Sequence, residues 1–141
     1  MPGTNPIILY DGVCGLCNRM VQFLLNHDRE GRLRFASLQS DFAAKVLGRH
    51  GIDPKDLDTV HVIENYDQTS ERVLQRSDAI LRAGRELGGF YGASSSIARV
   101  VPRPLRDIVY RLVATNRYRV FGKYDTCMLP DPDQRSRFLD L

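Results

Sequence analysis

The stretch Pro6-Ile-Ile-Leu-Tyr10-Asp-Gly-Val-Cys14-Gly-Leu-Cys17 decides how the rest of the chain is interpreted. Its first five residues are typical of a short buried strand, and Asp11-Gly12 is typical of a turn. From Val13 to about His27 the apolar residues recur at helical spacing, which predicts a helix. The two cysteines are therefore expected in the first turn of a helix that directly follows a strand.

This position favours redox chemistry at the cysteine pair. The first amides of a helix have no partners within the helix, and the helix dipole favours negative charge there. A thiolate is the reactive form of cysteine, and a helix N-terminus lowers the pKa of the thiol. Two thiols at this spacing can close a disulfide and reopen it. We expect Cys14, the more exposed thiol, to attack, and Cys17 to resolve the mixed disulfide.

Asp11 lies three residues before Cys14 and has two interpretations. Its carboxylate can cap the helix amides, or it can accept a proton from a thiol during exchange. A carboxylate beside the pair also raises the pKa of a thiol, which opposes the helix terminus. We therefore take Cys14, Cys17 and Asp11 as the candidate catalytic residues.

Beyond the pair, strands and helices alternate along the chain. The predicted elements are a strand at residues 33–37, a short helix at 42–47, and a hairpin of two strands at 59–64 and 70–75. Ser77 is expected to cap a helix that ends at Gly88-Gly89. The order β-α-β-α-β-β-α predicts an α/β fold with a thioredoxin-like or glutaredoxin-like core, a mixed sheet and helices on both faces.

The pattern changes after Gly89, where residues 90–96 are predicted to form a loop before a final helix. An apolar stripe at helical spacing should pack this helix on the core. The stripe consists of Leu105, Ile108, Val109, Leu112 and Val113. We predict one domain over residues 1–141, with the core at about 6–88, a helical extension at about 89–128 packed on it, and a tail at 129–141.

The composition narrows the classes of protein to which the chain can belong. With 43% hydrophobic and 26% charged residues, the 141-residue chain is an ordinary globular protein. No apolar run approaches the ~20 residues of a membrane span. Residues 1–6 carry neither basic charge nor a long apolar stretch, so we expect no signal peptide, a cytoplasmic location and no membrane partner. A net charge of +3 is too small to favour nucleic acid.

Two alternatives to a redox enzyme stay open. Between Arg99 and Lys123, seven basic residues face the single acid Asp107, so the C-terminal region could instead serve a binding module that attracts an acidic partner. A zinc site of the Cys₃His type is less favoured, since no second C-x-x-C accompanies the first. Its ligands would be Cys14, Cys17 and Cys127 with His27, His50 or His61.

Asp11-Gly-Val-Cys14-Gly-Leu-Cys17 matches the pattern D-x-x-C-x-x-C, and with it the chain resembles the DCC family of thiol-disulfide oxidoreductases, which have a thioredoxin-like fold. Residues 76–80 are similar to that family's second block, and residues 105–110 and 116–127 to its C-terminal block. The resemblance extends from about residue 6 to 128. It implies a thiol-disulfide oxidoreductase, and we expect no bound cofactor and no metal.

Ordinary thioredoxins carry a cis-proline just before the third strand, facing the cysteine pair. Here that position falls near residues 57–59, and the nearest proline is Pro54. We therefore expect a different substrate site, for which the candidates are Ser77, Asp78, Arg117 and Tyr118. The expected substrate is a protein or a low-molecular-weight thiol or disulfide, with an electron donor that the sequence does not identify. Cys127, without a partner at C-x-x-C spacing, is expected to be dispensable.

Overall fold

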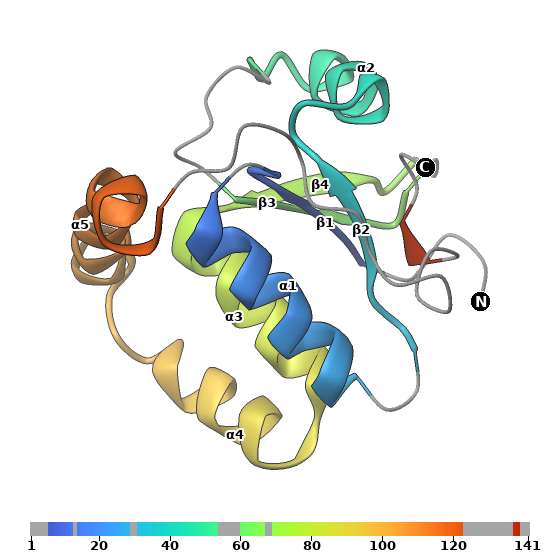
Figure 1. Cartoon of the computed structure of the whole chain (residues 1–141). Coiled ribbons are helices and arrows are strands. Elements are labelled where there is room, and N and C mark those ends of the chain that lie inside the picture. The colour runs from blue at the N-terminus through green and yellow to red at the C-terminus, as the bar shows by residue number, and fades with distance from the viewer. Residues whose placement is uncertain are drawn as a thin grey trace.

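A mixed sheet organises the computed structural model, which describes residues 6–12, 14–28, 31–53, 60–66, 69–122 and 137–138 (Figure 1). The described strands are β1 (Ile7–Tyr10), β2 (Arg34–Ser37), β3 (His61–Glu64) and β4 (Arg72–Gln75). They lie in the order β2-β1-β3-β4. Strand β1 is parallel to β2 and antiparallel to β3, and β3 is antiparallel to β4. The strand that leads to the cysteines is thus a central one.

The helices cover both faces of this sheet. They are α1 (Gly15–His27), α2 (Asp41–Arg49), α3 (Arg76–Leu87), α4 (Gly89–Ala98) and α5 (Arg103–Phe121). Helices α1 and α3 lie on one face and α2 on the other, while α4 and α5 extend beyond α3 (Figure 1). The order through α3 is β-α-β-α-β-β-α, which confirms the predicted thioredoxin-like core. Within the described residues, none of the helices is long and apolar enough to cross a bilayer.

Strand β1 divides the core because its successive side chains point to opposite faces. Ile8 and Tyr10 join the apolar cluster under α1 and α3. Ile7 and Leu9 join the cluster under α2. All four are buried, so the strand is fixed from both sides. The turn that follows it, from Asp11 to Cys14, therefore starts from a rigid part of the molecule.

Helix α4 occupies a segment that the sequence predicted as a loop, and that prediction is wrong. Its sequence, GFYGASSSIA, has few large apolar residues and therefore shows no clear helical period. The helix packs closely on α3 because Gly84 has no side chain. A Cβ atom at Gly84 would collide with the hydroxyl oxygen of Ser95. Close backbone approach thus stabilises a helix that the apolar pattern does not reveal.

The apolar stripe of α5 does not pack on the core, contrary to the prediction. All five of its members are exposed, and Leu112 keeps 66% of its surface accessible. The opposite side of the helix is docked instead. There Ala114 is buried, and the Tyr110 hydroxyl accepts a hydrogen bond from the Val60 amide at 2.7 Å. The buried side of α5 is largely polar, so apolar periodicity marks the wrong face.

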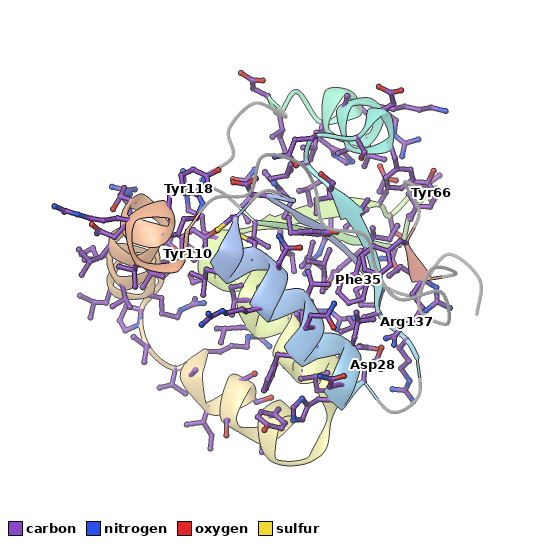
Figure 2. The ribbon with its side chains drawn as sticks, in the orientation of Figure 1. Asp28, Phe35, Tyr66, Tyr110, Tyr118 and Arg137 are labelled. Atoms are coloured by element: carbon purple, nitrogen blue, oxygen red, sulfur yellow. The ribbon has the colours of Figure 1, made fainter. Side chains whose placement is uncertain are left out.

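The end of the chain returns to the sheet edge at β2. Phe138 forms a parallel bridge to Phe35, and their rings stack with centroids 5.3 Å apart. The Arg137 guanidinium binds the carboxylate of Asp28 (Figure 2). Residues 123–136, which include Cys127, lie outside the described residues, as do Pro54 and the predicted cis-proline position at 57–59.

Candidate active site

The cysteine pair lies at the start of α1, as predicted. Cys14 is the N-cap, and its Sγ accepts a hydrogen bond from the Cys17 amide at 3.4 Å. Both cysteines are free thiols, and they lie 3.6 Å apart. The Asn18 side chain braces the turn by donating to the carbonyls of Gly12 and Cys14, at 2.9 and 2.8 Å. A short approach of the two sulfurs would let an oxidant that accepts two electrons, such as a substrate disulfide, convert the pair into a disulfide.

The two thiols have opposite acidities. A hydrogen bond from the Cys17 thiol is the main cause that lowers the pKa of Cys14 from 9.0 to about 6, and the amides of Cys17 and Leu16 add to it. The positive charge of Arg117 acts in the same direction, while burial opposes it. The reciprocal hydrogen bond, together with burial, raises the pKa of Cys17. At neutral pH, Cys14 therefore holds the negative charge and Cys17 holds the proton.

Neither sulfur is open to solvent, which corrects the expectation that Cys14 is the more exposed. Cys14 has no accessible surface and Cys17 has 6%. The C-terminal end of α5 lies against the first turn of α1, where the Gly15 amide donates to the Gly122 carbonyl at 3.0 Å. Tyr118 packs against the apolar cluster that includes both cysteines. The sequence shows no local sign of a cover that comes from more than 100 residues away.

Asp11 is fully buried and lies at the centre of a polar cluster. Its Oδ2 accepts hydrogen bonds from Arg117 Nη2, at 3.3 Å, and from the Tyr118 hydroxyl. Its Oδ1 accepts from Gln39 Nε2 at 2.7 Å. Because Cys14 is the N-cap of α1, the capping role considered for Asp11 belongs to Cys14. Asp11 instead ties the end of β1 to α5.

Tyr118 and Tyr110 lie on the side of α5 that faces the sheet and α1 (Figure 2). Burial, followed by the hydrogen bond to Asp11, raises the pKa of Tyr118 to about 12. Burial also raises the pKa of Tyr110 to about 12. Both phenols therefore stay protonated at neutral pH. Tyr118 can donate to Asp11 but cannot supply a negative charge.

The four candidate substrate residues separate into two pairs. Arg117 and Tyr118 lie beside Asp11, as described above. Ser77 does not cap α3, whose N-cap is Gln75, and its hydroxyl donates to Asp107 Oδ1 at 2.5 Å. Asp78 forms ion pairs with Arg103 and Arg106, each at 3.0 Å. Through these contacts Ser77 and Asp78 hold α5 on α3.

An apolar cavity of about 260 Å³ adjoins Cys17 between α1, α3 and α5. Its lining includes Leu16, Met20, Val109, Val113 and Arg117. Sequence reasoning missed this cavity, and it also missed Tyr110 and Gln39. Gln39 could have been found, because it follows β2 and the parallel strands β1 and β2 end at the same edge of the sheet.

The zinc alternative finds no support among the described residues, where no three His, Cys, Asp or Glu side chains gather at metal-binding distance. His50 Nε2 lies 2.7 Å from Glu71 Oε2, and His27 Nδ1 lies 2.8 Å from the Phe23 carbonyl. Cys127, the third sulfur of the proposed site, lies outside the described residues.

Comparison with known proteins places these features in a family. The family model for DCC1-like thiol-disulfide oxidoreductases matches residues 8–123. The chain belongs to this family. Relatives of the chain include the uncharacterized protein YuxK of Bacillus subtilis (strain 168), 38% identical over 135 residues that cover 96% of this chain and 94% of YuxK. A chloroplastic DCC family protein of Arabidopsis thaliana is 38% identical over 125 residues, covering 89% of this chain and 70% of that protein. No solved structure matches the chain.

Proposed function

We propose that this DCC protein is a thiol-disulfide oxidoreductase that cycles Cys14 and Cys17 between a dithiol and a disulfide. The observation that carries the proposal is the shared hydrogen bond at the helix N-terminus, which lowers the pKa of Cys14 to about 6. A thiol with this pKa is largely ionised at neutral pH, and the thiolate is the nucleophile in disulfide exchange. Membership of a family described as thiol-disulfide oxidoreductases supports the same conclusion.

The proposed reduction of a substrate disulfide takes two steps. The Cys14 thiolate attacks one substrate sulfur, which forms a mixed disulfide and breaks the substrate disulfide, so the second substrate sulfur leaves as a thiolate. Cys17 then loses its proton and attacks Cys14, which releases the first substrate sulfur and leaves a Cys14–Cys17 disulfide. Two electrons pass from the pair to the substrate, and an external dithiol donor must return them. The reverse sequence oxidises a substrate dithiol.

The second step needs a proton acceptor, because the pKa of Cys17 is raised. We assign this role to Asp11, whose main chain and charge both act on Cys17. Arg117 and Tyr118 hold the Asp11 carboxylate in place and are positioning residues. Replacing Asp11 with Asn should therefore slow the resolving step more than the formation of the mixed disulfide.

The substrate is proposed to be a protein or a low-molecular-weight thiol or disulfide, and the setting is proposed to be the cytoplasm. Three cysteines are too few for a disulfide scaffold, so a close pair suits catalysis in a reducing compartment. Since both sulfurs are covered, exchange with a bulky disulfide requires the end of α5 to separate from the first turn of α1. A small disulfide needs a smaller opening.

Trapping experiments test the order of attack. Incubated with oxidised glutathione, a Cys17→Ser variant should accumulate a mixed disulfide on Cys14, because the resolving thiol is missing. A Cys14→Ser variant should accumulate much less on Cys17, because the remaining thiol of the pair is protonated. Intact mass and peptide mapping read out both products. The opposite pattern, or equal trapping by the two variants, would refute the assignment of Cys14 as nucleophile.

A further inference from the structure

An apolar surface without a partner runs along α5 and the end of α4. We define the α4–α5 face by its eight exposed apolar residues, whose accessible fractions run from 43% at Val101 to 83% at Val100. They are Ile97, Val100, Val101, Leu105, Ile108, Val109, Leu112 and Val113. Side chains of α5 project away from the sheet in Figure 2. A contiguous exposed apolar surface of this kind marks an interaction site more often than chance.

The α4–α5 face cannot turn inward, because polar contacts hold the opposite side of α5. The Tyr110 hydroxyl accepts from the Val60 amide, and Arg117 binds the buried Asp11. Asp107 accepts from Ser77 near the start of the helix. Rolling α5 to bury its apolar stripe would break these buried contacts. The exposure is therefore built into the way the helix docks.

The α4–α5 face is flanked by exposed arginines whose positive charges can bind an anionic partner. Arg99, Arg111 and Arg119 are exposed, and within the described part of the chain none of them has a carboxylate partner. The nearby acids are already occupied: Asp78 pairs with Arg103 and Arg106, and Asp107 accepts from Ser77. The face thus combines an apolar surface with unpaired arginines and no unpaired acid among the described residues 89–122.

We propose that the α4–α5 face docks on the surface of an anionic lipid bilayer. Apolar side chains of an interfacial helix enter the boundary between headgroups and acyl chains, and arginines bind lipid phosphates. The charge pattern disfavours the simplest rival, a symmetric dimer, because both of the contacting surfaces would carry unpaired arginines and no unpaired acid. The expectation of no membrane partner rests on the absence of a spanning segment, which does not concern a helix that lies flat.

Docking in this way holds the cysteine site near the bilayer. Val109 and Val113 belong to the α4–α5 face and also line the cavity beside Cys17. The binding itself needs no thiol chemistry. A Cys14→Ser/Cys17→Ser variant should therefore bind vesicles as well as the wild type, which separates this proposal from the proposed redox function.

Vesicle sedimentation tests the proposal directly. The wild type should sediment with vesicles of equal parts phosphatidylglycerol and phosphatidylcholine, release with added salt, and fail to sediment with pure phosphatidylcholine. Leu112→Glu and the Arg111→Glu/Arg119→Glu pair should each weaken binding about tenfold or more. Lys45→Glu is the matched control, since Lys45 is exposed on α2 at the other face of the sheet (Figure 1), and it should bind like the wild type.

Tryptophan fluorescence gives a second readout, because the chain contains no tryptophan. The emission of a Leu112→Trp variant should shift to the blue on addition of the anionic vesicles, and that of a Lys45→Trp variant should not. The proposal is overturned if the wild type ignores anionic vesicles, if both tryptophans respond alike, or if Lys45→Glu loses as much binding as Leu112→Glu. A wild-type dimer that Leu112→Glu converts to a monomer, without vesicle binding, would instead establish self-association.

Discussion

One hydrogen bond between neighbouring thiols decides where the negative charge of the site lies. The Cys17 thiol donates to Cys14, which lowers the pKa of Cys14 and raises that of Cys17. Burial raises the pKa of both groups, whereas the hydrogen bond shifts the two pKa values in opposite directions and is the main cause of each shift. The difference between the two cysteines thus comes mainly from their contact and from the amides at the helix start.

The pH dependence of alkylation tests this contact. A lowered pKa means that the thiolate of Cys14 is present above about pH 6, so its alkylation rate should rise through about pH 6 and then level off. Replacing Cys17 with Ala removes the donor and should move the midpoint toward the ordinary thiol value of 9.0. Cys17→Ser keeps a hydroxyl donor and should stay closer to the wild type. Identical profiles for the Ala and Ser variants would show that the contact does not set the acidity.

Breaking the buried cluster around Asp11 should lower the free energy of unfolding strongly. Arg117 keeps only 5% of its side chain accessible, so Asp11→Asn leaves a buried guanidinium without its counter-charge. We expect a loss of about 3 kcal/mol in the free energy of unfolding. The Asp11→Asn/Arg117→Met double variant should lose clearly less than the sum of the single losses, measured by urea denaturation. Additive losses would mean that the two groups are not coupled.

The sequence could predict only part of this site. Cys14, Cys17 and Asp11 were predicted because they lie within seven residues of one another on one strand–turn–helix unit. Arg117 and Tyr118 were named through a family resemblance, and no local pattern indicates that they reach a carboxylate 106 and 107 residues earlier in the chain. The burial of Cys14 was predicted wrongly for the same reason, since the end of α5 lies against the first turn of α1.

At the scale of secondary structure, α5 shows how a helix can be docked by its polar face. Its apolar stripe faces outward, whereas four polar residues contact the core or α3. These residues are Arg106, Asp107, Tyr110 and Arg117. Its docking therefore depends on specific hydrogen bonds more than on apolar burial. A helix held in this way is more sensitive to the loss of one buried donor or acceptor than to the loss of a large exposed side chain.

On α5, the loss of one buried hydroxyl should therefore lower the free energy of unfolding more than the loss of an exposed apolar side chain. Tyr110→Phe leaves the Val60 amide without its hydroxyl partner and should lower the free energy of unfolding by about 1–2 kcal/mol. Leu112→Ala removes a larger part of an exposed side chain and should change it by less than about 0.5 kcal/mol. Urea denaturation of the two variants measures both values. A larger loss for Leu112→Ala would show that the apolar stripe is buried after all.

The sequence predicted the strands and helices of the core well, and it predicted the two helices beyond the core, α4 and α5, less well. Strands β1 to β4 and helices α1 to α3 carry clear apolar patterns because each has one face in the core. Helix α4 was missed because glycine and serine permit its close packing on α3 without an apolar period. Helix α5 was found but assigned the wrong buried face, because burial on its polar side depends on partners that are distant in sequence.

For the whole molecule, the site is a junction between the thioredoxin-like core and α5. The core supplies both thiols and Asp11, and α5 supplies the groups that bind Asp11 and cover the start of α1. The acidity of the thiols is thus set mainly by their contact and the amides of α1, with a smaller contribution from Arg117 of α5. The outward face of α5 remains available for docking while its inward face completes the site.

A redox titration with peptide mapping tests the central claim most directly. Trypsin releases residues 1–19, which contain Cys14 and Cys17, separately from residues 124–135, which contain Cys127. In glutathione buffers of increasing oxidised fraction, the 1–19 peptide should lose two hydrogens, and dithiothreitol should restore them. The 124–135 peptide should keep its free thiol. If Cys127 pairs with either cysteine, if the 1–19 peptide never loses two hydrogens, or if the purified protein holds stoichiometric zinc, the redox assignment is contradicted.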